Sequence, residues 1–206
     1  MDEQLSTVWL SAEQVRTLAH PLRLRLLGAL RLDGPATATA LAHELGTNTG
    51  ATSYHLRKLA DVGLVREEPA RGTGRERWWR SVHQVSSWRG TSFDDDPDAR
   101  AAADWLTSYF VQQFVRLAED WHMARDGYPI EWRDAAEYSD YILTLTSDQL
   151  RRLNADLHAV VERYRADPGP GDGVAEQVML YTYGFPRVVN GDRGGSAGDG
   201  SVGGEP

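Results

Sequence analysis

The spacing of hydrophobic positions predicts four helices in the first third of the chain. Leucines recur every three to four residues from Leu22 to Leu30, the period of a helix with one apolar face. A helical period also appears in residues 12–19, 37–45 and 49–60. Residues that open or close helices stand at the expected boundaries: the capping box Ser11–Gln14, Pro21, Gly34, Thr37, Gly46, Asn48 and Gly63.

Two short strands are predicted after the fourth helix, in residues 64–69 and 75–82. The glycines of ARGTGR between them are typical of a hairpin loop. Trp78 and Trp79 are adjacent, so in a strand they point to opposite faces, and we expect one of them in the core. Helix, tight turn, helix and hairpin in this order predict a winged helix-turn-helix.

The fourth helix has two contrasting faces. At about 100° per residue, Thr52, Leu56 and Leu59 fall together and would face the core, while Tyr54 and Arg57 lie opposite. The outer face has no aliphatic residue and offers hydrogen-bonding and cationic groups, as a helix in the DNA major groove requires. A solvated amphipathic helix is the alternative interpretation, and the basic hairpin behind the helix favours DNA.

Arginines are concentrated in the predicted hairpin. Arg71 and Arg75 flank the glycines at its tip, and Arg77 follows. A flexible basic tip beside a recognition helix would contact phosphates or the minor groove. A solubilising loop is the alternative.

The segments LAHPLRLRLLGAL and TALAHELGTNTGATSYHLRKLADVGLVREEPARGTGRERWWR resemble the ArsR-type winged-helix regulators of bacteria. The A-H-P-L-R opening, the S-x-H-L-x-x-L motif that begins at Ser53 and the G-L-V before the wing carry the likeness, over about residues 11–85. The resemblance implies a dimer whose recognition helices and wings contact an operator. The candidate DNA-binding residues are Thr49, Gly50, Ser53, Tyr54, Arg57, Lys58, Arg71, Arg75 and Arg77.

We expect no metal, no cofactor and no enzymatic activity. Metal sensors that resemble this chain use Cys before the recognition helix or His/Asp pairs on the C-terminal helix. The chain has no Cys, and Glu119, Asp120 and His122 lack a repeated pairing. Nucleophile-elbow, Walker and zinc-protease motifs are also missing from the sequence.

The charge distribution separates two parts of the chain. The 206 residues carry a formal net charge of −8, which alone would argue against binding DNA. Residues 11–89, however, hold 12 Arg or Lys and 7 Asp or Glu, whereas residues 91–206 hold 10 and 21. The basic surplus therefore coincides with the predicted DNA-binding part. The sequence has no apolar run of membrane-spanning length and no secretory leader, so a cytoplasmic protein is expected.

A long helix is predicted after a linker of residues 86–97. Asp96 and Pro97 are suited to begin it, and it runs to about residue 125. Its apolar stripe is wider than one small domain can cover, which indicates a dimer helix, packing within the chain, or both. The ArsR-type resemblance and the need to bind two operator half-sites favour dimerisation. The expected dimer residues are Leu106, Phe110, Phe114 and Leu117.

The remainder predicts a small α+β unit. Residues 138–145 and 175–185 alternate like strands, and a capping box at Thr146 to Gln149 opens a helix between them. The glycine-rich residues 187–206 are expected to form a disordered tail. Aromatic side chains could line a pocket for an organic effector, or could simply build a core. They are Tyr109, Trp121, Trp132, Tyr141, Tyr181 and Tyr183.

The sequence thus predicts a mainly α (α+β) protein. Its expected parts are a winged helix-turn-helix domain (1–85), a linker (86–97), a dimerisation and effector domain (98–186) and a tail (187–206). The expected function is a homodimeric transcriptional regulator, a repressor, on a palindromic operator in double-stranded DNA. The alternatives are a small-molecule sensor that releases DNA and a protein-interaction module.

Overall fold

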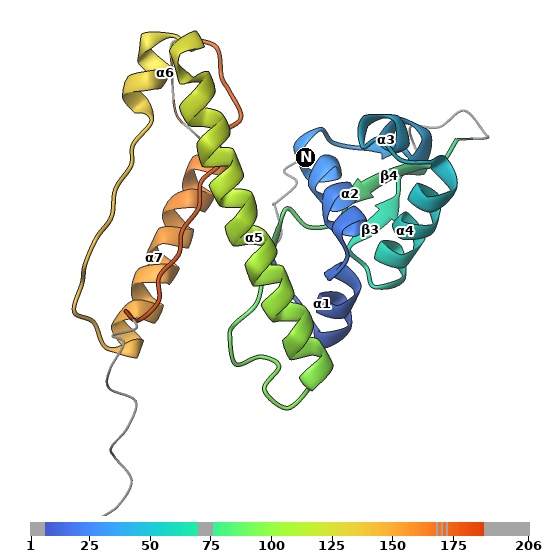
Figure 1. The fold of residues 1–206 in the computed structure, drawn as a ribbon, viewed down its shortest axis with the longest axis horizontal. Helices are drawn as coiled ribbons and strands as arrows, with labels where there is room; N and C mark the ends of the chain where they lie inside the picture. Colours follow the sequence, from blue (N-terminus) through green and yellow to red (C-terminus); the bar gives the residue numbers. More distant parts are fainter. Residues whose placement is uncertain (1–6, 70–75, 168, 170, 172, 188–206) are drawn as a thin grey trace, which may run out of the picture. The chain divides into compact units, whose positions relative to one another are not determined.

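The computed structural model describes residues 7–69, 76–167, 169, 171 and 173–187. The chain forms two compact units, Met1–Glu137 and Tyr138–Pro206 (Figure 1). The division falls after residue 137, and not at the linker expected in residues 86–97. The long helix therefore belongs to the same unit as the winged elements.

The four predicted helices of the first unit are confirmed. They are α1 (Ala12–Leu18), α2 (Pro21–Leu32), α3 (Ala38–Glu44) and α4 (Thr49–Asp61). The capping box before α1 is present, and Asn48 Oδ1 accepts a hydrogen bond from the Ala51 amide at 2.8 Å. Gly46 and Gly63, which follow α3 and α4, have φ angles of +63° and +74°, a region that favours glycine.

The first unit also contains a small antiparallel sheet with the strand order β2-β4-β3, in which β2 precedes α3 and the other two strands follow α4. The hairpin strands β3 (Val65–Glu67) and β4 (Trp78–Ser81) lie within the two predicted segments. β2 (Ala36–Thr37) joins β4, and β1 (Thr7–Trp9) pairs in parallel with β5 (Val85–Ser87). Trp79 is buried and Trp78 is only partly buried, so the predicted opposition of the two indoles is confirmed.

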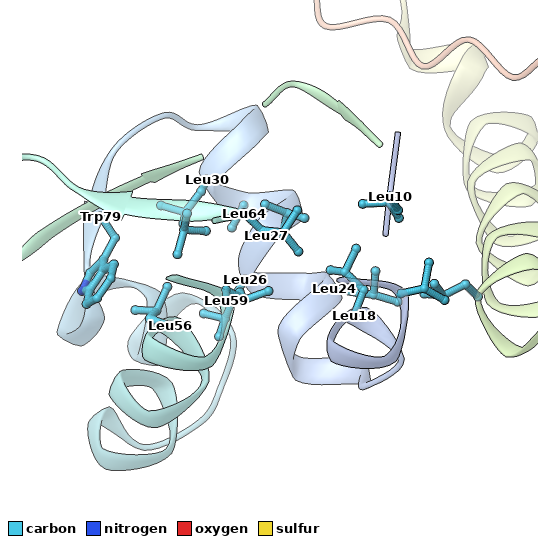
Figure 2. Close-up of a cluster of buried hydrophobic side chains, with 14 of the residues drawn as sticks. Leu10, Leu18, Leu24, Leu26, Leu27, Leu30, Leu56, Leu59, Leu64 and Trp79 are labelled. Carbon is cyan, nitrogen blue, oxygen red and sulfur yellow. The ribbon is translucent and has the colours of Figure 1, made fainter. Parts of the chain in front are cut away.

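The core of the first unit lies between α2 and α4, with the sheet at one end and α1 at the other. Figure 2 shows Leu26 of α2 beside Leu56 and Leu59 of α4, with Trp79 against Leu56. Leu26, Leu56 and Leu59 have no exposed side-chain surface. Burial of one such leucine stabilises the fold by about 1.5–3 kcal/mol. The recognition helix is therefore fixed by its apolar face.

The long helix α5 (Pro97–Ala124) starts beside α1 and extends beyond the winged elements (Figure 1). Asp96 caps it by accepting from the Ala99 amide at 2.9 Å, and it also accepts from Arg16 of α1 at 2.6 Å. These two donors lower the pKa of the Asp96 carboxyl. A short 3-10 turn, η2 (Arg125–Gly127), and α6 (Ile130–Ala135) complete the unit.

One of the four expected dimer residues lies in the core of its own chain. Leu106 is fully buried with Ala99 and Ala103 on the part of α5 that contacts α1. It is therefore not available to a second copy, and this expectation is corrected. Phe110 is partly buried against the same core, whereas Phe114 and Leu117 are 40% and 37% exposed.

The second unit contains the predicted helix but neither predicted strand in its described residues. α7 (Ser147–Ala166) begins with the capping box of Thr146 and Gln149. Residues 138–145 and 175–185 have no sheet partner, so the strand predictions are wrong. A Cβ added to Gly184 would lie 3.2 Å from Leu150 Cδ1, so this segment runs along α7 instead. The expected tail lies almost wholly outside the described residues.

Candidate nucleic-acid interface

The two faces predicted for α4 are confirmed by its burial pattern. Thr52, Leu56 and Leu59 are fully buried. On the other side Tyr54 is 52% exposed, and Arg57 is exposed beside it. The remaining candidates on this helix are exposed or, for Ser53, partly buried: Thr49, Gly50, Ser53 and Lys58. A continuous polar and cationic surface therefore covers the outer side of α4.

The turn between α3 and α4 sets the start of this surface. The Thr47 amide donates to the Ala42 carbonyl at 2.9 Å, which ends α3 tightly. Gly50 is suited to the first turn of α4, because a Cβ there would lie 3.3 Å from Asn48 Oδ1, the capping atom. A larger side chain would press on the cap. The glycine also leaves the backbone open to close approach by a partner.

The basic side chains of the interface differ in their pairing. Lys58 Nζ lies 3.4 Å from Asp61, and Arg77 Nη1 lies 3.0 Å from Glu67. Both pairs are exposed, and exposed ion pairs contribute only about 0–1 kcal/mol. Arg57 has neither a hydrogen bond nor an ion pair with any described residue. It is therefore the cation of α4 most available to an anionic partner.

The predicted wing is only partly described. Arg71 and Arg75 lie outside the described residues, so their role stays a prediction. On the described strands, Arg66 of β3 stands opposite Arg80 of β4 in the register of the hairpin. Arg80 lies 3.8 Å from Glu68. The base of the wing therefore carries a mixture of both charges.

The sequence patterns did not predict one cluster of side chains beside α4, which contains two histidines, a tyrosine and an arginine. His20, the residue before α2, packs against His55 of α4, with ring centroids 4.4 Å apart and the ring planes tilted by 38°. The His55 ring meets the edge of Tyr54 at 5.1 Å, and Arg23 of α2 lies in the same cluster. Burial and the neighbouring Arg23 charge lower the pKa of His20, and they do the same for His55. The A-H-P-L-R motif was the only signal of this cluster.

The six aromatic residues of the predicted effector pocket are divided between the two units. Tyr109, Trp121 and Trp132 belong to the first unit, where Tyr109 stacks on Trp105 at 5.5 Å and Trp121 meets Tyr128 at 5.0 Å. In the second unit Tyr181 stacks on Tyr183 at 6.1 Å, and Tyr141 is 78% exposed. The pocket stays a prediction.

One surface hollow lies at the end of α5, and it is lined by none of those six aromatic residues. Its walls are Arg125, Asp126, Ile130, Arg133 and Asp134. The charges within it are largely balanced, because Asp126 lies 4.0 Å from Arg125 and 3.6 Å from Arg133. No helix in the described part of the chain is long and apolar enough to cross a membrane.

Residues 18–68 match the family model of a helix-turn-helix domain. No curated protein matches the chain. Among solved structures, the chain is similar to the homodimeric winged helix-turn-helix domain of Mb0332 from Mycobacterium bovis, a possible ArsR-family regulator. The two are 24% identical over 55% of this chain and 82% of that one, with a TM-score of 0.31.

Two further structures show similar values. The transcriptional repressor BigR from Xylella fastidiosa is 23% identical over 48% of this chain and 83% of its own, with a TM-score of 0.32. A MarR family regulator from Neisseria meningitidis is 16% identical over 71% and 76%, with a TM-score of 0.31. At these TM-scores the likeness is too partial to bring any property of those proteins to this chain.

The family match and the order of elements agree. α3 and α4 form the helix-turn-helix, and the hairpin β3–β4 follows as the wing. The first part of the chain is therefore a winged helix-turn-helix, and it resembles the ArsR-type domains that its sequence motifs indicated.

Proposed function

We propose that this chain, which contains a winged helix-turn-helix of ArsR-like sequence, is a DNA-binding transcriptional regulator that represses its targets as a homodimer in the cytoplasm. The outer face of α4 carries the proposal: Thr49, Ser53 and Tyr54 offer hydrogen-bonding groups, and Arg57 has no partner among the described residues. Arg57 suits bidentate contact with guanine or with phosphate. Bound at an operator, such a dimer would block access of the polymerase.

Selection from random double-stranded DNA tests the DNA-binding function. The purified full chain should enrich a palindrome whose half-sites lie about one helical turn apart. A control chain with Arg57→Ala and Ser53→Ala should enrich no motif. Failure of the unmodified chain to enrich any sequence would contradict the proposal and favour the protein-interaction module.

Dimerisation is proposed through the second half of α5. Beyond the part that contacts α1, this helix exposes Val111, Phe114, Val115 and Leu117 between 37% and 46%. A two-fold dimer needs the same apolar patch on both copies, and two copies would present two recognition helices to a palindrome.

We expect Phe114→Glu to convert a dimer into a monomer, because a carboxylate would lose its water in the apolar interface. Sedimentation equilibrium measures the mass. Thr107→Glu, on the exposed part of the same helix, is the matched control and should leave the dimer intact. A dimeric Phe114→Glu chain would place the interface elsewhere.

The repressor role has its own test. A reporter gene placed behind the selected palindrome should be silenced by the chain and released by Arg57→Ala. Higher reporter expression with the unmodified chain would make it an activator.

A further inference from the structure

Most basic side chains in the first unit have a partner. Arg16 pairs with Asp96, and Arg25 and Arg31 donate to the carbonyls of Leu45 and His83. Lys58, Arg77 and Arg80 face carboxylates, and Arg89 lies over the Trp9 ring at 4.8 Å. Within the described part of residues 7–89, the arginines whose side chains make no hydrogen bond, no ion pair and no cation–π contact are Arg23, Arg57 and Arg66.

Arg23 differs from the other two unpaired arginines in its burial. Arg57 and Arg66 are exposed, and water solvates their guanidinium groups. The side chain of Arg23 is partly buried, and its Nε is buried without a hydrogen-bond partner. A buried N–H group left unpaired destabilises the fold, and more so when the group is charged. The two Nη groups of Arg23 also make no hydrogen bond with a described residue and are not buried, so they can donate to an anion outside the fold.

The neighbours of Arg23 hold it beside the recognition helix. α2 packs against α4, and the tilted rings of His20 and His55 are in contact there, with centroids 4.4 Å apart. The His20 ring is fixed, because its Nδ1 accepts from the Leu22 amide at 3.2 Å. Tyr54 continues the cluster to the outer face of α4, where Lys58 Nζ lies 6.0 Å from the Tyr54 ring centroid.

The positive charge of this cluster resides on Arg23 near neutral pH. Burial lowers the pKa of both His20 and His55, so their imidazoles are neutral there. Burial also lowers the pKa of Arg23, opposed by the Tyr54 phenol, but a guanidinium stays protonated. Among the described residues, the groups that interact electrostatically with Arg23 are the imidazoles of His20 and His55 and the phenol of Tyr54, and no carboxylate is among them.

We propose that Arg23 binds a phosphate of the DNA backbone at the edge of the groove that α4 enters. This inference rests on the proposed function and extends the DNA-facing surface from α4 onto α2. Tyr54 joins the two parts, since it is half-exposed on the outer face and adjoins the cluster that contains Arg23. A guanidinium matches phosphate geometry through two parallel hydrogen bonds. Such a contact would fix the position of α4 in the groove without reading sequence.

Salt dependence of binding tests the contact directly. The full chain, Arg23→Gln and Arg25→Gln would each be titrated onto a labelled duplex of mixed sequence, about 30 base pairs long to admit two half-sites. Arg25 is the matched control because it lies on the same helix, is exposed and carries the same charge. Loss of one phosphate contact reduces the slope of log K against log salt by about 0.9. We expect the slope for Arg23→Gln to be smaller than that of the parent chain by about this amount, and any change for Arg25→Gln to be less.

The outcomes separate this inference from the proposed function. A parent chain that binds no DNA would overturn both. Binding by the parent with equal slopes for the two variants would overturn the Arg23 contact alone, since any change would then be a general effect of charge. Arg23→Lys should retain the slope, because lysine keeps the positive charge.

A measurement on the unmodified chain covers the case in which Arg23→Gln does not fold. The Arg23 Nε–H is buried, so its NMR signal should be visible and can be assigned by its loss in Arg23→Lys. A shift of this signal on addition of the duplex would support the contact, and an unshifted signal at saturation would overturn it.

Discussion

The two units of the chain differ in what they bury. In the first, a continuous cluster of apolar side chains extends from Leu10 through the winged elements to Leu106 on α5. In the second, no described side chain is buried, and Ile142, Val174 and Phe185 are 77% or more exposed. The first unit therefore contains the interactions that hold its own fold. The second unit exposes apolar side chains, which contact with another surface would bury.

The largest expected effect breaks the core of the first unit. Leu56→Ala should lower the free energy of unfolding by about 2–5 kcal/mol, because it removes a fully buried side chain and leaves a cavity. Leu153→Ala in the partly buried face of α7 should cost less than about 1 kcal/mol. Urea unfolding followed by circular dichroism measures both. Equal losses would contradict the contrast between the units.

A second comparison concerns charge. Arg57→Ala should weaken binding to the selected palindrome by about 1–3 kcal/mol if the guanidinium contacts a base. Arg151→Ala, an exposed arginine of α7, should leave this affinity unchanged. Fluorescence anisotropy measures both constants. Equal binding by Arg57→Ala and the parent chain would remove Arg57 from the interface.

The N-terminal caps of α4 and α7 allow the same kind of substitution to be compared in the two units. Asn48→Ala removes the side-chain acceptor at the start of α4 and should cost about 1 kcal/mol of global stability. Thr146→Ala removes the corresponding acceptor of α7, but this helix buries no residue. Its loss should appear as faster hydrogen exchange in α7 without a lower midpoint for the first unit. A lowered midpoint for that unit would show that the two helices unfold together.

The smallest expected effect is a pH dependence confined to the first unit. Burial is the largest cause that lowers the pKa of His20, His55 and His83 below 6.5; a neighbouring arginine adds to it for His20 and His83, and His20 and then Arg23 add to it for His55. The unfolded chain therefore binds more protons between the lowered values and about 6.5, so stability rises with pH through this window. The contribution of these histidines to the free energy of unfolding should be complete above pH 6.5 and should decrease as the pH falls below that value. Thermal melts should show a flatter decline for His55→Gln, and an unchanged decline would exclude His55 as a source.

Local chemistry made much of the first unit predictable. Capping residues such as Ser11, Thr37 and Asn48 act on backbone amides within three positions, so their helices follow from short segments of sequence. The division of α4 into an apolar and a polar face follows in the same way from the helical period. The outer residues Tyr54 and Arg57 could therefore be selected before the structure was known.

Strands were harder to predict than helices, because a strand forms only where a distant segment of the chain pairs with it. The alternation in residues 138–145 and 175–185 suits a strand, but an extended segment beside a helix also presents alternate side chains to it. Conversely, β1 and β5 are each three residues long and exist only because they pair across the chain. Nothing local distinguishes such short segments from loops.

The sequence by itself determined the helix boundaries, the wing and the cationic outer face of α4, because each depends on residues a few positions apart. Only the tertiary structure decided that Leu106 belongs to the core of its own unit and that Arg23 lies near Tyr54 with no ion pair to a described carboxylate. Both facts come from helices that meet across long stretches of chain, where α5 contacts α1 and α2 contacts α4. Burial and charge pairing are properties of those contacts, and no single segment carries them.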